Sequence, residues 1–206
     1  KGKKNFRLIG MGGSILGSQA IYNFLKSKVK KNFLFFNNLN SFQKMNKKEK
    51  FANLIISKSG NTLETISNAN ILINKKDENI FITENKPSYL FNLASKLKSE
   101  VIHHNNFIGG RYSVLSEVGM LPAKLMGLDP KKFRQFDNLI KNKKFLNLLI
   151  HNTGGILFFV KNKKFNSIII NYDEKSDYFF QWYQQLVAES LGKKGKGILP
   201  IISTMP

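Results

Sequence analysis

The sequence predicts an α/β fold built on an open, doubly wound parallel sheet. Over the first hundred residues, short apolar runs of strand length alternate with segments whose apolar residues recur at helical spacing. Strands joined by such helices pair in parallel, and repeated units of this kind make a sheet with helices on both faces. The length of 206 residues and the hydrophobic content of 42% allow one large or two small domains with a buried core.

The elements of the first hundred residues follow from these patterns in order. Residues 6–9 form a short apolar run, and the glycines after it lead into an amphipathic helix from Ser14 to Leu25. The basic segment 42–51 is expected to be a surface helix or loop, and Pro87 suits the first turn of a helix. The other expected elements are strands at 33–36, 54–56, 80–82 and 101–102 and helices at 62–73 and 87–97.

The second half of the chain changes in character after the double glycine at 109–110. It is mostly helical as far as residue 152, and an Asp-Pro pair at 129–130 marks a boundary. We therefore predict a first domain at 1–128 and the beginning of a second α/β domain at 129–206. The pattern stops within that second domain, so we expect a fragment lacking both ends. The later elements are helices at 152–163 and 177–191 and strands at 167–170 and 198–202.

The net charge of +20, from 33 basic and 13 acidic residues, raises the question of a nucleic acid or an anionic membrane as partner. Sites that bind phosphates or base edges favour the forked guanidinium of arginine. Here 30 of the 33 basic residues are lysines, which accompany abundant asparagine. Codon bias in an A/T-rich genome accounts for both, and the lysines show no regular interleaving with aromatic residues. We therefore expect neither nucleic acid nor membrane as partner.

Composition excludes other classes of site and protein. With no cysteine, the chain has no disulfide, no thiolate zinc site and no cysteine nucleophile. The longest apolar stretch, 145–160, is interrupted by polar residues and is shorter than the roughly 20 residues of a membrane span. The first residues lead into a strand and a glycine turn rather than a signal sequence. A cytoplasmic protein is the expectation.

The first candidate site is the glycine turn after the first expected strand, residues 10–17. A dinucleotide-binding turn would need a glycine where Ile15 stands and an acidic residue at the end of the next strand, where Phe36 and Asn37 stand. What remains is a turn that presents backbone N–H groups, and the hydroxyl of Ser14, at a helix N-terminus. Such a turn suits an anion, but Ser14 as a simple helix cap explains it equally well.

The second candidate site, Ser57-Lys58-Ser59-Gly60-Asn61-Thr62, follows the third expected strand at its carboxyl end. Doubly wound folds bind their ligands at that end of the strands. Three hydroxyls, an ammonium group and a glycine before a helix are what a phosphate monoester with several acceptor oxygens requires. A structural loop that only begins the next helix stays open as the alternative.

Two further segments carry charged groups suited to catalysis. Arg111 follows the double glycine, and a guanidinium stabilises negative charge that develops on oxygen. On the helix at 177–191, Gln185 and Glu189 are four residues apart and share a face with Trp182. A carboxylate in this apolar stretch is partly desolvated, which raises its pKa toward values useful for a general base. The alternatives are an arginine that binds loop carbonyls and a glutamate at a helix end near lysines.

Four segments together resemble the glucose-6-phosphate isomerase family, whose domains are of the sugar isomerase (SIS) type. They occur in the family's order and span nearly the whole chain. The first is shared with other SIS domains, whereas the other three are specific. The segments are GMGGSILG, SKSGNTLET, GGRYSVLSEVGMLPAKLMGLDP and WYQQLVAESLGKKGKG, which resemble the family's first glycine motif, phosphate loop, arginine signature and catalytic-base helix.

The resemblance implies a flavodoxin-like, three-layer SIS fold, followed by the start of a second SIS-type unit. It also implies interconversion of glucose 6-phosphate and fructose 6-phosphate, a step of glycolysis and gluconeogenesis, through a cis-enediol. Glu189 would move the proton between C2 and C1, and Arg111 would stabilise the enediolate. This chemistry needs no metal and no organic cofactor. The residues implied to bind the substrate are Gly13, Ser14, Ser57, Lys58, Ser59, Thr62, Gly110 and Gln185.

The same resemblance implies a homodimer with its active site near the subunit interface. The family opens the sugar ring with a histidine and a lysine further along the chain, so we expect these outside the present chain and the chain alone to be inactive. His103, His104 and His151 match no family site and are interpreted as structural or surface residues. Two alternatives stay open: an isomerase acting on both glucose and mannose phosphates, and a non-catalytic SIS domain that senses a sugar phosphate.

Overall fold

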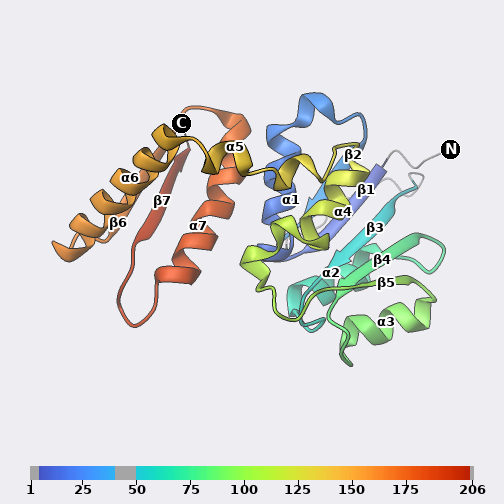
Figure 1. The fold of residues 1–206 in the computed structure, drawn as a ribbon. Helices are drawn as coiled ribbons and strands as arrows, with labels where there is room; N and C mark the ends of the chain where they lie inside the picture. Colours follow the sequence, from blue (N-terminus) through green and yellow to red (C-terminus); the bar gives the residue numbers. More distant parts are fainter. Residues whose placement is uncertain (1–4, 40–49, 205–206) are drawn as a thin grey trace.

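The computed structural model describes residues 5–39 and 50–204, and its main sheet has five parallel strands (Figure 1). The strands lie in the order β2-β1-β3-β4-β5, and every neighbouring pair is parallel. The doubly wound α/β fold predicted from the sequence is therefore confirmed. The strands are β1 (Asn5–Gly10), β2 (Asn32–Phe36), β3 (Ala52–Ile56), β4 (Glu78–Thr83) and β5 (Glu100–His103).

Helices cover both faces of this sheet. On one face, Leu54 of β3 belongs to a buried cluster with Val118 of α4, and α1 packs against the same cluster. On the other face, Ile55 clusters with Ala69 of α2 and Leu90 of α3. Successive residues of β3 thus serve opposite layers, as the pleat of a strand requires. The helices are α1 (Leu16–Phe24), α2 (Leu63–Leu72), α3 (Tyr89–Leu97) and α4 (Glu117–Leu125).

The central strands owe their composition to burial on two sides. All five residues of β3 are buried, and Leu8 on the neighbouring β1 has no exposed surface. A parallel sheet covered by helices on both faces gives such continuous apolar runs, which is why the sequence pattern identified these strands. Each fully buried Leu or Ile stabilises the fold by about 1.5–3 kcal/mol relative to an exposed one.

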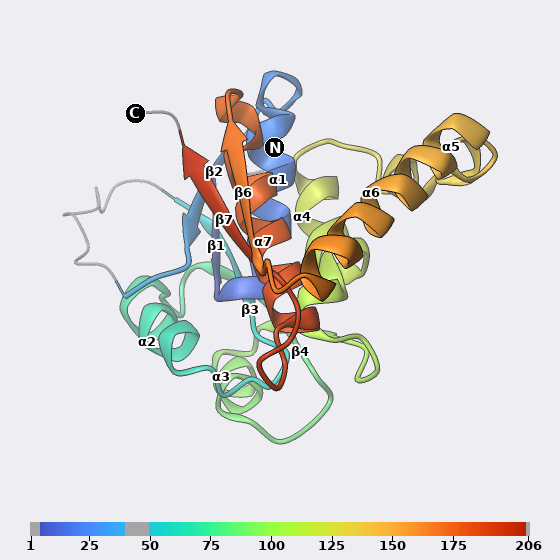
Figure 2. The ribbon, with the colours of Figure 1, turned by 90° about the vertical axis from the view of Figure 1, so that its left-hand side faces the viewer.

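A second, smaller group of elements follows α4 along the chain. β6 and β7 pair in parallel as a two-stranded sheet that is separate from the first. α7 packs against α1 of the first group, whereas α6 extends away from the five-stranded sheet (Figure 2). None of the helices in the described part of the chain is long and apolar enough to cross a membrane. The elements are α5 (Asp137–Ile140), α6 (Lys143–Lys161), β6 (Asn166–Asn171), α7 (Asp177–Leu191) and β7 (Leu199–Thr204).

One predicted element boundary in this second group is wrong. The helix expected at 152–163 is the second half of α6, which starts after Asn142, and the side chain of Asn142 accepts a hydrogen bond from the amide of Phe145. The apolar run at 145–160 is interrupted by polar residues around 152, but these do not end the helix, and neither do the glycines at 154–155, because a glycine inside a helix costs only about 1 kcal/mol relative to alanine. The apolar side chains on both sides of the pair therefore continue one helix.

Two predicted helix starts are also wrong. Ser14 does not cap α1, because it ends a short 3-10 helix, η1 (Gly12–Ser14), and Ile15 is the residue that precedes α1. Pro87 lies just before the helix rather than in its first turn, since Ser88 caps α3 by accepting a hydrogen bond from the amide of Phe91. Residues 42–49 of the expected basic helix or loop lie outside the described residues.

Candidate active site

The two candidate anion-binding turns leave the main sheet next to each other. They follow β1 and β3, and the last residues of these strands, Gly10 and Ile56, are partners in the register of the parallel pair. β1 leads through α1 to β2 on one side, whereas β3 leads through α2 to β4 on the other. The strand order reverses at this point, which is where doubly wound sheets bind their ligands. Both turns therefore lie at the switch point of the sheet, the place this fold class uses for ligands.

The first turn is built from close backbone approaches. Gly12 has a positive φ of +53°, and a side chain there would collide with the amide of Gln185 on α7. A Cβ on Gly13 would lie 2.5 Å from the carbonyl carbon and oxygen of Gly110. Only glycine fits these two positions. The turn thus packs directly against α7 and against the segment that carries Arg111, the 3-10 helix η3 (Gly110–Leu115).

The second turn, residues 57–62, is organised by its own hydroxyls. The Oγ of the buried Ser57 lies 2.9 Å from Oγ1 of Thr62 and accepts a hydrogen bond from the amide of Gly60. Thr62 precedes α2, but its side chain caps no backbone amide of the helix. Gly60 has a φ of +65°, and a Cβ there would collide with the side chain of Ser88. The turn therefore gathers hydroxyls, including that of the exposed Ser59, in front of a helix N-terminus, as an anion site does.

Lys58 is directed toward the loops after β4 and β5. Its Nζ donates a hydrogen bond of 2.9 Å to the carbonyl oxygen of Asn106 and lies 3.4 Å from Oε1 of Glu84. Glu84 also pairs with Lys86 at 3.0 Å. The hydrogen bond from Lys86, and after it the one from Lys58, lower the pKa of Glu84, although burial opposes them. A phosphate bound by Lys58 would have to replace or share these partners.

Arg111 reaches from η3 to the end of α7. Its Nε donates a hydrogen bond of 2.9 Å to Oγ of Ser190, and its Nη1 lies 3.6 Å from Oε2 of Glu189. The hydroxyl of Tyr112 lies 2.8 Å from the same Ser190 oxygen. Interaction with Tyr112, followed by the charge of Glu189, raises the pKa of Arg111. The pKa of Tyr112 is lowered chiefly by its hydrogen bond to Ser190 and then by Arg111. Arg111 is thus a fixed cation beside a carboxylate.

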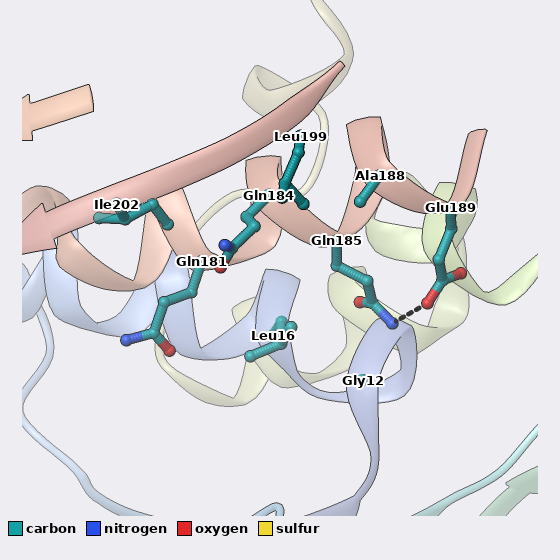
Figure 3. A pocket seen from close by; sticks show the side chains of 9 residues that line it. All are labelled: Gly12, Leu16, Gln181, Gln184, Gln185, Ala188, Glu189, Leu199 and Ile202. Atoms are coloured by element: carbon teal, nitrogen blue, oxygen red, sulfur yellow. Dashed lines mark hydrogen bonds between the residues drawn. The ribbon is translucent and has the colours of Figure 1, made fainter. Parts of the chain in front are cut away.

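Glu189 and Gln185 lie on one face of α7, as their spacing predicts. Nε2 of Gln185 donates a hydrogen bond of 2.8 Å to Oε1 of Glu189 (Figure 3). Both side chains border a hollow of about 680 Å³ that α7 forms with β7 and with the turn at Gly12. The Glu189 side chain is 48% exposed. The prediction of a desolvated carboxylate is therefore wrong for this structure, because the neighbours of Glu189 are an amide and a guanidinium.

Sequence reasoning missed three polar residues of this region. Ser190 and Tyr112 each follow a predicted residue directly, and that adjacency was the only signal in the sequence. Glu84 comes directly after β4, at the same edge of the sheet as the two turns, but only the strand order reveals that it lies near Lys58. Among residues 5–39 and 50–204, no three His, Asp or Glu side chains are grouped so that they could hold a metal ion.

Comparison with known proteins identifies relatives over almost the whole chain. Residues 1–198 match the family model described as phosphoglucose isomerase. The chain is 37% identical, over 226 aligned positions, to the glucose-6-phosphate isomerase of Methanocaldococcus jannaschii, covering 98% of this chain and 54% of that protein. It is 33% identical to the glucose-6-phosphate isomerase of Mycoplasma genitalium, covering 95% of this chain and 50% of that one. The chain thus spans about half the length of these relatives.

Solved structures share the fold at lower identity. A hypothetical protein from Thermus thermophilus superposes with a TM-score of 0.78 at 22% identity, covering 99% of this chain and 54% of that one. A tagatose-6-phosphate ketose/aldose isomerase from Escherichia coli superposes with a TM-score of 0.68 at 16% identity, covering 98% of this chain and 56% of that one. These likenesses concern the fold alone. Since the family model matches nearly every residue, the chain belongs to the phosphoglucose isomerase family.

Proposed function

We propose that the protein containing this chain interconverts glucose 6-phosphate and fructose 6-phosphate as an aldose-ketose isomerase. The observation that carries the proposal is the pair formed by the Arg111 guanidinium and the Glu189 carboxylate, 3.6 Å apart. Moving a proton next to a carbonyl requires one positioned base and one cation at the oxygen that becomes negative. The names of the relatives, glucose-6-phosphate isomerases of archaea and bacteria, support the same reaction.

In this reaction Glu189 takes the proton from C2 of the open-chain aldose and returns it to C1. The electrons of the broken C–H bond move toward the carbonyl oxygen and give a cis-enediolate, whose negative charge Arg111 stabilises. The hydroxyl proton on O2 passes to O1 as C1 takes up its proton, so that C2 becomes the carbonyl of the ketose. Gln185 binds the substrate and keeps a carboxylate oxygen of Glu189 oriented through its amide hydrogen bond. Both side chains border the same hollow, which supports this division of roles.

The sugar phosphate is proposed to bind at the two adjacent turns of the main sheet. Backbone N–H groups at Gly13 and Gly110 and the hydroxyl of Ser14 line one side. The hydroxyl-rich turn after β3 lines the other, and Lys58 exchanges one of its present partners for a phosphate oxygen. The residues of that turn in this proposal are Ser57, Lys58, Ser59 and Thr62.

We also propose that residues 1–128 form one SIS-type unit and that 129–206 begin a second. The separate pairing of β6 with β7 supports this division. Apolar side chains that are exposed on α6 and β6 support it as well, because a larger unit would bury them; they include Leu148, Ile150, Phe158, Ile168 and Ile170. A cytoplasmic homodimer is proposed for the whole protein, and analytical ultracentrifugation tests its subunit number.

Isomerisation is tested by assaying the full-length protein with glucose 6-phosphate and following fructose 6-phosphate. In deuterated water, the wild type should exchange the C2 proton of the substrate with solvent. Glu189→Gln should lower that exchange by about 10²–10⁴-fold, the usual contribution of a positioned base, while sugar-phosphate binding persists. Glu174→Gln, at an exposed carboxylate near the other end of α7, is the matched control. Wild-type exchange in Glu189→Gln would show that another group is the base.

A further inference from the structure

We propose that His104 is a positioning residue for Arg111. His104 follows β5 and is only 3% exposed, unlike His103 and His151, which lie at the surface. Its backbone amide donates a hydrogen bond of 2.8 Å to the carbonyl of Thr83, which fixes it to the end of β4. The inference rests on the proposed function, because it assigns His104 a task only through the role of Arg111.

Both ring nitrogens of His104 face hydrogen-bond acceptors. Nδ1 contacts Oε1 of Glu117, and Nε2 lies 3.2 Å from the carbonyl oxygen of Ile108. A carbonyl oxygen has no proton to donate, so Nε2 must carry one for this hydrogen bond to form. Nδ1 and the Glu117 carboxylate form the second hydrogen bond, which needs a proton on one of these two groups. Since the imidazole is almost completely buried, both bonds form away from solvent, where an unpaired polar group is costly.

These two partners lie on either side of the segment that carries Arg111. Ile108 comes immediately before the double glycine at 109–110, and Glu117 is the first residue of α4, separated from the end of η3 by Ser116. Glycine lacks a side chain that would restrict the backbone, so the entry to η3 needs an external constraint. A single imidazole supplies it by bridging both ends of the segment.

The same loop also contacts the proposed phosphate turn. Asn106, between His104 and Ile108, accepts the hydrogen bond of Lys58 through its carbonyl oxygen. The backbone that His104 holds at one point is thus bound to the phosphate turn at another. His104 thereby fixes the distance between the turn that binds phosphate and the arginine that stabilises the enediolate.

The test compares three variants of His104 in the full-length protein by steady-state kinetics. His104→Ala removes both hydrogen bonds and should lower kcat by about 10- to 100-fold, as a small misplacement of a catalytic group does, with a smaller change in KM. His104→Gln carries an amide at about the position of Nε2 and should recover part of kcat. His104→Asn carries one at about the position of Nδ1 and should recover less. His103→Ala, at the exposed neighbour, should have the wild-type kcat.

Hydrogen exchange followed by mass spectrometry provides a readout that is independent of catalysis. His104→Ala should speed exchange of the amides in 105–116 and leave those of α2 unchanged. Should the alanine variant fail to fold, the glutamine and asparagine variants carry the test, and asparagine should show the faster exchange. Wild-type kcat and wild-type exchange in the folded variants would overturn the inference. A wild type without isomerase activity would overturn the proposed function instead, and faster exchange in 105–116 would still show that His104 holds this segment.

Discussion

The guanidinium of Arg111 lies 3.6 Å from the carboxylate of Glu189, although the two residues belong to different groups of elements. Arg111 is carried by η3, which joins the main sheet to α4, whereas Glu189 is carried by α7, which packs between α1 and β7. The packing of α7 on α1 therefore determines whether the carboxylate and the guanidinium meet. Ser190 strengthens this junction, because its hydroxyl accepts the Nε hydrogen bond of Arg111.

Replacing Ser190 with alanine should weaken catalysis without removing a catalytic group. The Nε of Arg111 loses its acceptor on α7, and the guanidinium becomes free to turn away from the developing oxyanion. We expect kcat to fall about tenfold, in line with the sensitivity of catalysis to small displacements, and KM to change little. Steady-state kinetics of the full-length protein measures both constants.

The matched control for this prediction is Ser95→Ala, at an exposed serine whose hydroxyl donates a hydrogen bond to the carbonyl oxygen of Phe91 within α3. It should have wild-type constants. If Ser190→Ala instead raised KM and left kcat unchanged, Ser190 would contribute to binding the substrate and not to the orientation of Arg111.

Gly13→Ala should displace the arginine segment. The added Cβ would lie 2.5 Å from backbone atoms of Gly110, which cannot rotate away as a side chain could. The two backbones must separate, so we expect kcat to fall about 100-fold and the free energy of unfolding to decrease by about 1–3 kcal/mol. Kinetics and urea denaturation measure the two effects. Gly154→Ala, where a Cβ meets nothing within 4 Å, should show neither loss.

The sequence was sufficient to predict the strands of the main sheet and both turns at its edge, because each rests on local information. The apolar runs of β1 and β3 reflect burial on two faces, and the glycines and hydroxyls of the turns are adjacent in the chain. The continuity of α6 across residue 152 was missed because polar residues interrupt the apolar run there, whereas the apolar residues on both sides belong to one helix.

The contacts between distant segments could not be predicted in the same way. The sequence around Glu189 is apolar and suggested a desolvated carboxylate, but its cation comes from Arg111 in another segment. For His104 the sequence predicts a structural or surface residue but not which segments it joins. The structure shows it buried between Ile108 and Glu117. Such pairings depend on the strand order and on how α7 packs, which no single segment specifies.

The phosphate turn is tested by the double variant Lys58→Ala/Ser59→Ala. Removing one ammonium and one hydroxyl should weaken the binding of a phosphorylated sugar acid by about 10- to 100-fold, since charge-assisted hydrogen bonds are the strong ones at such sites. Isothermal titration calorimetry measures the Kd. Lys75→Ala/Ser95→Ala removes the same groups at exposed positions and should bind like the wild type. An unchanged Kd in the first variant would show that the phosphate binds elsewhere.

Glu84 should make the stability of the fold depend on pH below neutrality. Its pKa is lowered in the folded chain from the usual 4.5, chiefly by Lys86 and then by Lys58. In the acidic range the unfolded chain therefore binds more protons at this carboxyl than the folded chain does, and stability rises with pH. The contribution of Glu84 is complete above about pH 4.5 and is lost as the pH falls through the lowered pKa.

Urea denaturation tests this prediction at a series of pH values from 3 to 7, roughly the range in which carboxyls titrate. Toward low pH, the free energy of unfolding should decline less steeply for Glu84→Gln than for the wild type. Glu100→Gln, at an exposed carboxylate, is the comparison. If the free energy of unfolding of Glu84→Gln fell with acid as steeply as that of the wild type, the two lysines would not hold Glu84 as a carboxylate. Lys58 could then bind phosphate without first breaking its ion pair with Glu84.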